Sequence, residues 1–267
     1  MLYNYEKWEN RCFGFPENES MNMNEENIIS VGDRVRLYAS PHGLAWGTDA
    51  YLLAAYIKKS RRACELGCGC GVISLLAAAH GRAESVSAIE ILPDMADLSR
   101  RNVALNGLDG RVRVHCADIR SIRPEDIGGR VDTVFANPPY IAHPGTENAD
   151  AAAQAARHEL HGGIGDFCAA AARLLNYRGS FFVVFRPDRL ADLFEALRRS
   201  KLEPKRMTMI HPDAASAPSL VLVEARLGAA PKLDVEAPLF FYRAGREEQP
   251  RVMSARTQAI YDTCSWQ

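Results

Sequence analysis

The chain has 267 residues, of which 47% are hydrophobic, and its 32 Lys and Arg residues almost balance 33 Asp and Glu residues, for a formal net charge of −1. This composition is typical of a globular protein with a sizeable core, and it lacks the basic excess of a protein that grips nucleic acid along a long track. No apolar run approaches the roughly 20 residues that a membrane span requires, and the N-terminal sequence does not resemble a secretory signal. We therefore expect a soluble, cytoplasmic protein with no membrane partner. Seven scattered cysteines, an odd number, argue against a disulfide framework.

The first part of the chain has two different patterns. Residues 1–27 are acidic, rich in Asn and Met and without useful periodicity, so we predict a flexible or loosely docked N-terminal arm, with the folded domain over residues 28–267. From Ile28, apolar and polar residues alternate around Gly32, which predicts a β-hairpin. Thr48 and Asp49 are interpreted as the N-cap of a buried helix over residues 49–58, which ends at two lysines.

From residue 63 onward, short apolar runs alternate with helical patterns, as in an α/β sheet with parallel strands. The predicted helices cover residues 72–80, 93–106, 163–176 and 188–200, and the predicted strands cover residues 63–66, 85–90, 112–116, 131–136, 180–185, 205–210 and 219–227. Only a short loop joins the last two strands. It is too short for a helical crossover, so these strands are expected to be antiparallel neighbours in an otherwise parallel sheet of seven strands.

A glycine-rich loop follows the first of these strands. Glu65 precedes Gly67, Gly69 and Gly71, and Glu90 ends the next strand. Glycines let the backbone approach a ligand closely, but the spacing departs from the dinucleotide fingerprint and suits a nucleoside ligand without a pyrophosphate.

This arrangement resembles motif I and the second-strand acid of class I S-adenosylmethionine-dependent methyltransferases. The resemblance implies a Rossmann-like fold and S-adenosylmethionine as cofactor, held by the glycine loop and Glu65. It further implies that Glu90 accepts hydrogen bonds from both ribose hydroxyls and that Asp118 contacts the adenine amino group. Thr48 and Asp49 either cover the methionine end of the cofactor or only cap their helix.

Two groups of residues invite a metal interpretation. Cys68 and Cys70 stand in the glycine loop, and His158 and His161 follow later in the chain. A single C-x-C lacks the ligands for tetrahedral zinc, and the two histidines do not have the i, i+4 spacing of a helical metal site. We therefore predict no metal.

Asn137, Pro138, Pro139 and Tyr140 directly follow a predicted strand, so they are expected at the carboxyl edge of the sheet, where open α/β folds build their sites. This N-P-P-Y resembles motif IV of amino-methyltransferases that modify adenine N6, cytosine N4 or the glutamine amide. An exocyclic amino group is a poor nucleophile because its lone pair is delocalised. The Asn137 side-chain oxygen and the Pro138 carbonyl are suited to accept its hydrogens and localise that lone pair.

Tyr140 offers a flat face for a flipped base or an amide. The catalytic set is therefore predicted as Asn137, Pro138 and Tyr140, with Asn137 also counted among the residues that contact the cofactor.

Residues 33–56, N-P-P-Y, residues 156–160 and residues 239–261 resemble the bacterial family of tRNA1(Val) adenine-37 N6-methyltransferases. The resemblance implies a tRNA substrate. Two alternatives remain open. One is a protein-glutamine N5-methyltransferase that resembles the release-factor enzymes, which usually carry an additional helical N-terminal domain. The other is a catalytically silent cofactor-binding subunit, which has no need of Asn137. The oligomeric state stays open.

Basic residues near the C-terminal half are candidate contacts for an anticodon stem, although charge runs are more often solvated faces. They are Arg198, Arg199, Lys201, Lys205, Arg206, Arg243 and Arg246. Arg157, His158 and Glu159 either face substrate phosphates or form a solvated helix start.

Overall fold

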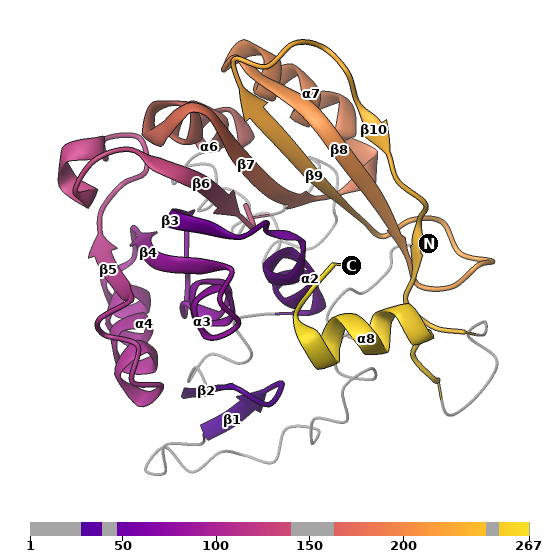
Figure 1. The fold of residues 1–267 in the computed structure, drawn as a ribbon, viewed down its shortest axis with the longest axis horizontal. Coiled ribbons are helices and arrows are strands. Elements are labelled where there is room, and N and C mark those ends of the chain that lie inside the picture. The colour runs from indigo at the N-terminus through magenta and orange to yellow at the C-terminus, as the bar shows by residue number, and fades with distance from the viewer. Residues whose placement is uncertain (1–27, 39–46, 140–162, 244–250, 267) are drawn as a thin grey trace, which may run out of the picture.

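The computed structural model describes residues 28–38, 47–139, 163–243 and 251–266. The predicted N-terminal arm, Tyr140, and Arg157 to His161 lie outside the described residues. A twisted central sheet organises the described part, with helices on both of its faces (Figure 1). Among the described residues, no helix is long and apolar enough to cross a membrane.

The central sheet confirms the predicted topology. Its strands lie in the order β10-β8-β9-β7-β6-β3-β4-β5, and β11 also pairs with β8. The pairs among β3 to β7 are parallel, whereas β9 is antiparallel to both β7 and β8. The seven longer strands match the predicted ones: β3 (Ser60–Leu66), β4 (Ala83–Glu90), β5 (Val112–Cys116), β6 (Val131–Ala136), β7 (Leu175–Phe185), β8 (Leu202–His211) and β9 (Leu220–Leu227). The sequence missed two short strands, β10 (Asp234–Val235) and β11 (Leu239–Phe240).

Alternation along the strands builds two hydrophobic cores, one on each face of the sheet. In β7, Phe182 and Val184 point into the first core, and Phe181 and Val183 point into the second. Burial on both faces explains why these strands read as nearly continuous apolar runs. The first core contains residues of α2 (Thr48–Tyr56), α3 (Val72–Ala79), α4 (Pro93–Leu105) and α8 (Ala255–Thr263), and the second contains residues of α6 (Ile164–Leu174) and α7 (Leu190–Arg199).

Helix α2 differs from its predicted limits. Its N-cap is Gly47, in an extended conformation, so Thr48 and Asp49 already belong to the first turn, and their interpretation as the cap is wrong. The helix ends at Tyr56 because Ile57 is extended, and Lys58 lies beyond it with Nζ 2.7 Å from Glu224. All nine residues of α2 are buried, which makes this helix a rigid support.

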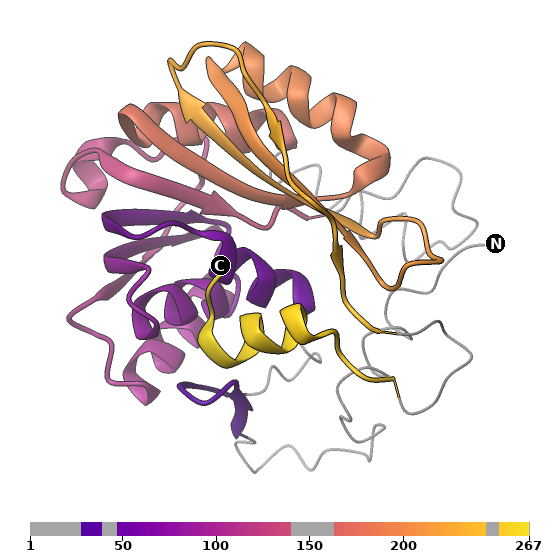
Figure 2. The ribbon, with the colours of Figure 1, turned by 45° about the vertical axis from the view of Figure 1, so that its right-hand side comes forward.

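The predicted N-terminal hairpin is confirmed as β1 (Ile28–Val31) and β2 (Val35–Tyr38). It docks on α4 through Asn102, whose side-chain oxygen accepts a hydrogen bond from the Tyr38 amide at 2.8 Å. The C-terminal helix α8, which the sequence did not indicate, lies along α2 (Figure 2). There the rings of Tyr51 and Tyr261 stack at 4.4 Å.

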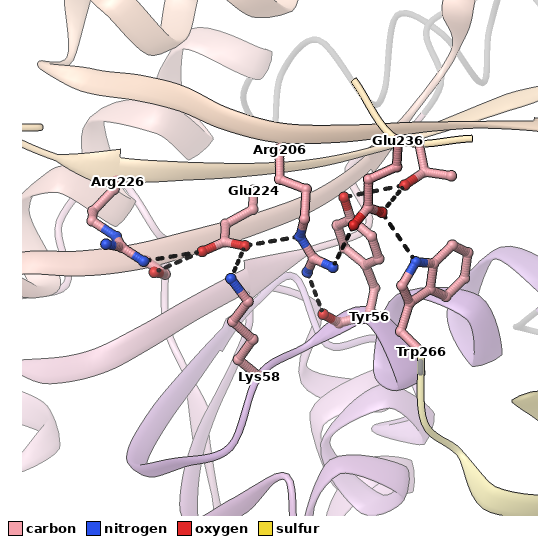
Figure 3. Close-up of polar contacts among 9 residues, drawn as sticks. Tyr56, Lys58, Arg206, Glu224, Arg226, Glu236 and Trp266 are labelled. Atoms are coloured by element: carbon pink, nitrogen blue, oxygen red, sulfur yellow. Dashed lines mark hydrogen bonds and ion pairs between the residues drawn. The ribbon is translucent and has the colours of Figure 1, made fainter. Parts of the chain in front are cut away.

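A buried ionic cluster ties the last strands to the end of α2 (Figure 3). The carboxylate of Glu224, whose side chain is 1% exposed, lies 3.0 Å from Arg206 and 3.4 Å from Arg226. The Arg206 guanidinium lies over the Tyr56 ring at 3.8 Å and donates to the Tyr56 carbonyl at 3.1 Å. Further along the same cluster, Glu236 accepts a hydrogen bond from the indole of Trp266 at 3.2 Å.

Candidate active site

The carboxyl ends of three adjacent parallel strands bring the predicted site residues together. Leu66, the last residue of β3, is in register with Ala136 of β6 and with Ile89 of β4. The glycine loop therefore lies between Glu90 at the end of β4 and Asn137 just after β6. Open α/β folds bind ligands at this edge, where loops leave the strands side by side.

The three glycines of the loop have positive φ, with values of 68°, 53° and 87° at Gly67, Gly69 and Gly71. A Cβ built on Gly71 would lie 2.4 Å from Ser99 Oγ, so this glycine allows α3 and α4 to approach closely. Around Gly69, by contrast, the nearest described atom to such a Cβ is Met95 Cε at 3.9 Å. The backbone at Gly69 is thus the part of the loop that a ligand can approach.

Glu90 holds the glycine loop in place. One of its carboxylate oxygens accepts a hydrogen bond from the Gly69 amide at 2.8 Å, and the other accepts one from the Leu92 amide at 2.9 Å. The residue is only 7% exposed. These bonds fix the carboxylate at the strand end, and each oxygen has a second lone pair for further donors.

Glu65 faces the start of α3. Its carboxylate accepts hydrogen bonds from both the backbone amide and the hydroxyl of Ser74. Burial, opposed by these hydrogen bonds, raises the pKa of Glu65 to about 8. The residue therefore anchors the helix that follows the loop, and its predicted contact with the cofactor stays a proposal.

Asp118 follows β5 and is 27% exposed at its side chain. It is linked to Glu90 through the neighbouring residue, since the Ala117 amide donates to the Glu90 carbonyl at 2.8 Å. The Arg120 guanidinium pairs with both Asp118 oxygens, at distances of 2.5 to 3.0 Å. A ligand amino group at Asp118 would thus share the carboxylate with Arg120.

Asn137 contacts a residue of helix α2. Its side-chain Nδ2 donates to Asp49 Oδ2 at 2.8 Å. Asp49 is 5% exposed and stands in the first turn of α2, so this bond brings the Thr48-Asp49 pair to the start of the N-P-P-Y segment. Pro138 is buried, and Tyr140 lies outside the described residues.

The thiols of the loop are enclosed. Cys68 and Cys70 are 5% and 3% exposed, and burial raises the pKa of both, that of Cys70 to about 12. Across the described ranges, no group of three or more His, Cys, Asp or Glu side chains is placed to hold a metal.

The basic residues singled out in the sequence do not form one surface. Arg198 pairs with Glu203 and Arg199 with Glu195, at the end of α7, while Arg206 belongs to the buried ionic cluster and is only 15% exposed. Because β8 runs parallel to β7, its start near Lys201 lies at the edge of the sheet opposite Asn137. The carboxylates and the Tyr56 ring around Arg206 favour a structural task for this residue over contact with RNA. Arg246 lies outside the described residues.

Sequence reasoning missed three residues of the site. Leu92, 44% exposed, stands beside Glu90 at the strand edge. Ser99 and Asn102 are fully buried on α4, where Asn102 donates to the Cys70 carbonyl at 2.9 Å. Two polar side chains three residues apart on an otherwise apolar helix face were the available signal.

These residues fit S-adenosylmethionine. Gly69 leaves backbone open to a ligand, Glu90 presents a fixed carboxylate, and Leu92 gives an exposed apolar surface next to it. The Thr48 hydroxyl is buried without a hydrogen-bond partner among the described residues, as expected where a ligand group supplies one.

Comparison with known proteins gives the same class. A sequence profile of the family described as "Methyltransferase small domain" matches residues 40–199. The tRNA1(Val) (adenine(37)-N6)-methyltransferase of Phocaeicola vulgatus is 31% identical over 183 residues, which are 66% of this chain and 74% of that protein. The enzyme of the same name from Cronobacter sakazakii is 30% identical over 154 residues, 57% of this chain and 62% of that protein.

Solved structures share the fold. A predicted O-methyltransferase from Agrobacterium tumefaciens has a TM-score of 0.65 and 23% identity, covering 82% of this chain and 97% of that one. M. jannaschii TYW2 in complex with AdoMet has a TM-score of 0.54 and 15% identity, covering 77% of this chain and 88% of that one. The profile match over more than half of the chain, the sheet order and the glycine loop at the carboxyl edge show that the chain belongs to the methyltransferase small domain family, within the class I S-adenosylmethionine-dependent methyltransferases.

Proposed function

We propose that this enzyme methylates N6 of an adenine in a tRNA, and that the target corresponds to adenine 37 of tRNA1(Val). The observation that carries the proposal is the position of Asn137 and Pro138 beside the glycine loop. The two segments are neighbours because Leu66 at the end of β3 is in register with Ala136 at the end of β6. An acceptor pair at this place is what the chemistry of an exocyclic amino group requires. A tRNA substrate also accords with a cytoplasmic location.

The relatives support the choice of substrate. The curated enzymes of P. vulgatus and C. sakazakii carry the name tRNA1(Val) (adenine(37)-N6)-methyltransferase. A structural neighbour with a TM-score of 0.53, aTrm5, was solved in complex with tRNALeu. These likenesses favour an RNA substrate over a protein glutamine.

The chemistry follows from the residues at the edge. S-adenosylmethionine supplies an electrophilic methyl group bound to a positively charged sulfur. In this proposal the Asn137 side-chain oxygen and the Pro138 carbonyl each accept a hydrogen bond from one N–H of the target amino group. The amino nitrogen would then be held with its lone pair directed at the methyl carbon, and positioning would supply much of the acceleration. The N–C bond would form as the C–S bond breaks, with the electron pair left on the sulfur of the departing group and one proton of the nitrogen released to water. The rigid φ of Pro138 keeps its carbonyl aimed.

The test is methyl transfer from labelled S-adenosylmethionine to total tRNA and, separately, to purified release factors. We expect label in RNA, and nucleoside mass spectrometry of that RNA should identify N6-methyladenosine. Label in the release factor and none in RNA would assign the chain to the glutamine methyltransferases. The Asn137→Ala variant is the matched control, with turnover expected to fall at least about 10²-fold while cofactor affinity changes little.

A catalytically silent binding subunit is the other alternative. It predicts cofactor binding by calorimetry with no transfer to any RNA, both in the wild-type protein and in Asn137→Ala. Transfer by the wild-type chain alone therefore rejects it.

A further inference from the structure

The contact between Asp49 and Asn137 joins two distant parts of the chain. The two residues are 88 positions apart, and Asn137 Nδ2 lies 2.8 Å from Asp49 Oδ2. Asp49 belongs to α2, whose residues are all buried, and Asn137 is the first residue after the central strand β6. Both side chains are thus carried by elements that cannot shift easily.

The bond selects one orientation of the Asn137 amide. An ionised carboxylate only accepts hydrogen bonds, so the group that faces Asp49 has to be the NH2 of the amide. A rotation by half a turn about the last side-chain bond would place two oxygens against each other. The Asn137 oxygen is therefore directed away from Asp49, and an oxygen is the atom that a target amino group needs.

The Asp49 carboxylate is itself fixed. Its other oxygen, Oδ1, accepts a hydrogen bond from the Ala50 amide at 2.8 Å, at the N-terminus of α2. The partial positive charge of a helix N-terminus interacts favourably with a negatively charged side chain placed there. A charged acceptor at the NH2 end also polarises the amide and increases the electron density on its oxygen, because hydrogen bonds in a chain reinforce one another.

We propose that Asp49 is a positioning residue for the transfer reaction: it orients and polarises the Asn137 amide so that the Asn137 oxygen accepts a hydrogen bond from the target amino group. This inference rests on the proposed function. Asp49, which the sequence predicted as a helix cap, would instead act on the reaction by orienting Asn137.

The first test compares Asp49→Asn with Asp192→Asn in single-turnover methyl transfer. Asp192 is the first-turn acid of α7 and pairs with Arg189 on the surface, so its variant makes the same chemical change away from the site. An amide at position 49 can face either end of the Asn137 amide, so the preference for one orientation is lost. We expect Asp49→Asn to lower the rate by about tenfold or more, with the KM for RNA and the Kd for S-adenosylmethionine changed by no more than about threefold. Asp192→Asn should keep the wild-type rate.

A double-mutant cycle separates positioning from a general structural role. Asp49→Asn combined with Asn137→Ala should be no slower than Asn137→Ala alone, because Asp49 acts only through Asn137. A further loss in the double variant contradicts the inference. If Asp49→Asn fails to fold, Asp49→Ser carries the same comparison.

A spectroscopic test uses the protein without cofactor. In ¹⁵N–¹H spectra, the side-chain NH2 signal that disappears in Asn137→Ala is that of Asn137. It should shift in Asp49→Asn and stay in place in Asp192→Asn.

The outcomes distinguish the two proposals. A wild-type rate for Asp49→Asn beside an inactive Asn137→Ala overturns the role of Asp49 and leaves the proposed function standing. Wild-type rates for both variants overturn the proposed function. Weaker cofactor binding with a normal rate at saturation assigns Asp49 to the cofactor and overturns the inference.

Discussion

At the scale of single residues, the site depends on carboxylates that differ in their surroundings. Glu90 is held by two backbone amides at the sheet edge, whereas Glu65 is enclosed between β3 and α3. The two side chains are chemically identical in the sequence. Their partners in the structure differ: Glu90 is bonded to amides of the loop and of Leu92 at the strand end, and Glu65 to the start of α3.

Replacing Glu90 with Gln should weaken S-adenosylmethionine binding. With Glu90 as the proposed acceptor for the ribose hydroxyls, the variant would lose the charge of that acceptor and turn an NH2 toward one of the two backbone amides. We expect a loss of about 1.5–3 kcal/mol in binding free energy, measured by calorimetry. Asp94→Asn, a charge removal on the exposed first turn of α4, is the control. An unchanged dissociation constant for Glu90→Gln, or preferential binding of NAD, contradicts the assignment of the loop.

Glu65 should make stability depend on pH. Its pKa of about 8 in the folded state exceeds the ordinary value of 4.5, so the folded protein binds more protons between these values. The contribution of Glu65 to the free energy of unfolding is therefore fully present below pH 4.5 and is lost as the pH rises through 8. In urea unfolding without cofactor, the free energy of unfolding of Glu65→Gln should therefore rise relative to that of the wild type between pH 5 and pH 8. As a control, Glu125→Gln at an exposed position should show the same pH dependence of unfolding free energy as the wild type. A difference between Glu65→Gln and the wild type that stays constant with pH would disprove the effect.

At the scale of elements, close packing of α3 and α4 shapes the glycine loop. Gly71 precedes α3, and Ser99 Oγ occupies the space where a Cβ would stand. Asn102 adds a second link from α4, to the Cys70 carbonyl on one side and to the Tyr38 amide of the hairpin on the other. The loop conformation thus depends on a helix that follows it by more than twenty residues.

Gly71→Ala should destabilise the protein more than Gly81→Ala. Both glycines have positive φ, at 87° and 65°, so both variants carry the backbone strain of about 1–2 kcal/mol. Only Gly71 adds the overlap with Ser99, worth a further ~1–3 kcal/mol, because nothing lies within 4 Å of a Cβ at Gly81 among the described residues. Thermal unfolding measures the difference. The Ser99→Ala background should reduce it, and equal losses for the two variants would contradict the packing argument.

At the scale of the whole molecule, the ionic cluster around Glu224 joins the antiparallel end of the sheet to α2. Burial by itself raises the pKa of Glu224, but hydrogen bonds and charges from Lys58 and Arg206 offset it, and the net pKa lies below its ordinary value. Its contribution to stability is therefore present above pH 4.5 and is lost as the pH falls below it.

Glu224→Gln should lower the free energy of unfolding by about 3–5 kcal/mol at pH 7, since it leaves the Arg206 guanidinium without its closest carboxylate. Arg226→Ala removes a partner that is 41% exposed and should cost less than about 1 kcal/mol. Denaturant unfolding decides between them. Similar small losses in both variants would show that the cluster contributes little.

The basic residues occupy two different edges of the molecule. Arg243 is exposed next to the carboxyl end of β8, because the preceding Tyr242 amide donates to the Pro212 carbonyl at 2.9 Å. Arg198 and Arg199 are paired at the opposite edge.

We therefore expect Arg243→Glu to raise the KM for tRNA and to reduce its salt dependence, since a lost phosphate contact lowers the number of released counterions. Arg198→Glu combined with Arg199→Glu should leave the KM within about twofold of wild type. Steady-state kinetics at two salt concentrations measure both. A larger effect of the double variant would place the RNA across the far edge instead.

The order and type of the main elements could be predicted from the sequence alone, and so could the edge of the sheet that carries the candidate site. Continuous apolar runs such as those of β6 and β7 report burial on both faces of a sheet, and this signal is local to each strand. The glycine loop and N-P-P-Y both stand directly after strands, so their meeting at one edge followed from parallel strand order. The antiparallel β8–β9 pair followed from the short loop between them.

Which side chains meet could not be predicted from the sequence and depends on the fold of the whole chain. The bond from Asn137 to Asp49, the pairing of Arg206 with Glu224 and the docking of α8 on Tyr51 all cross between elements that are separate in the chain. Periodicity and capping rules read a few neighbouring residues, so they interpreted Asp49 as a cap and Arg206 as a surface charge. Strand order and register set which residues face each other across the sheet, and these depend on packing of the whole chain into two cores.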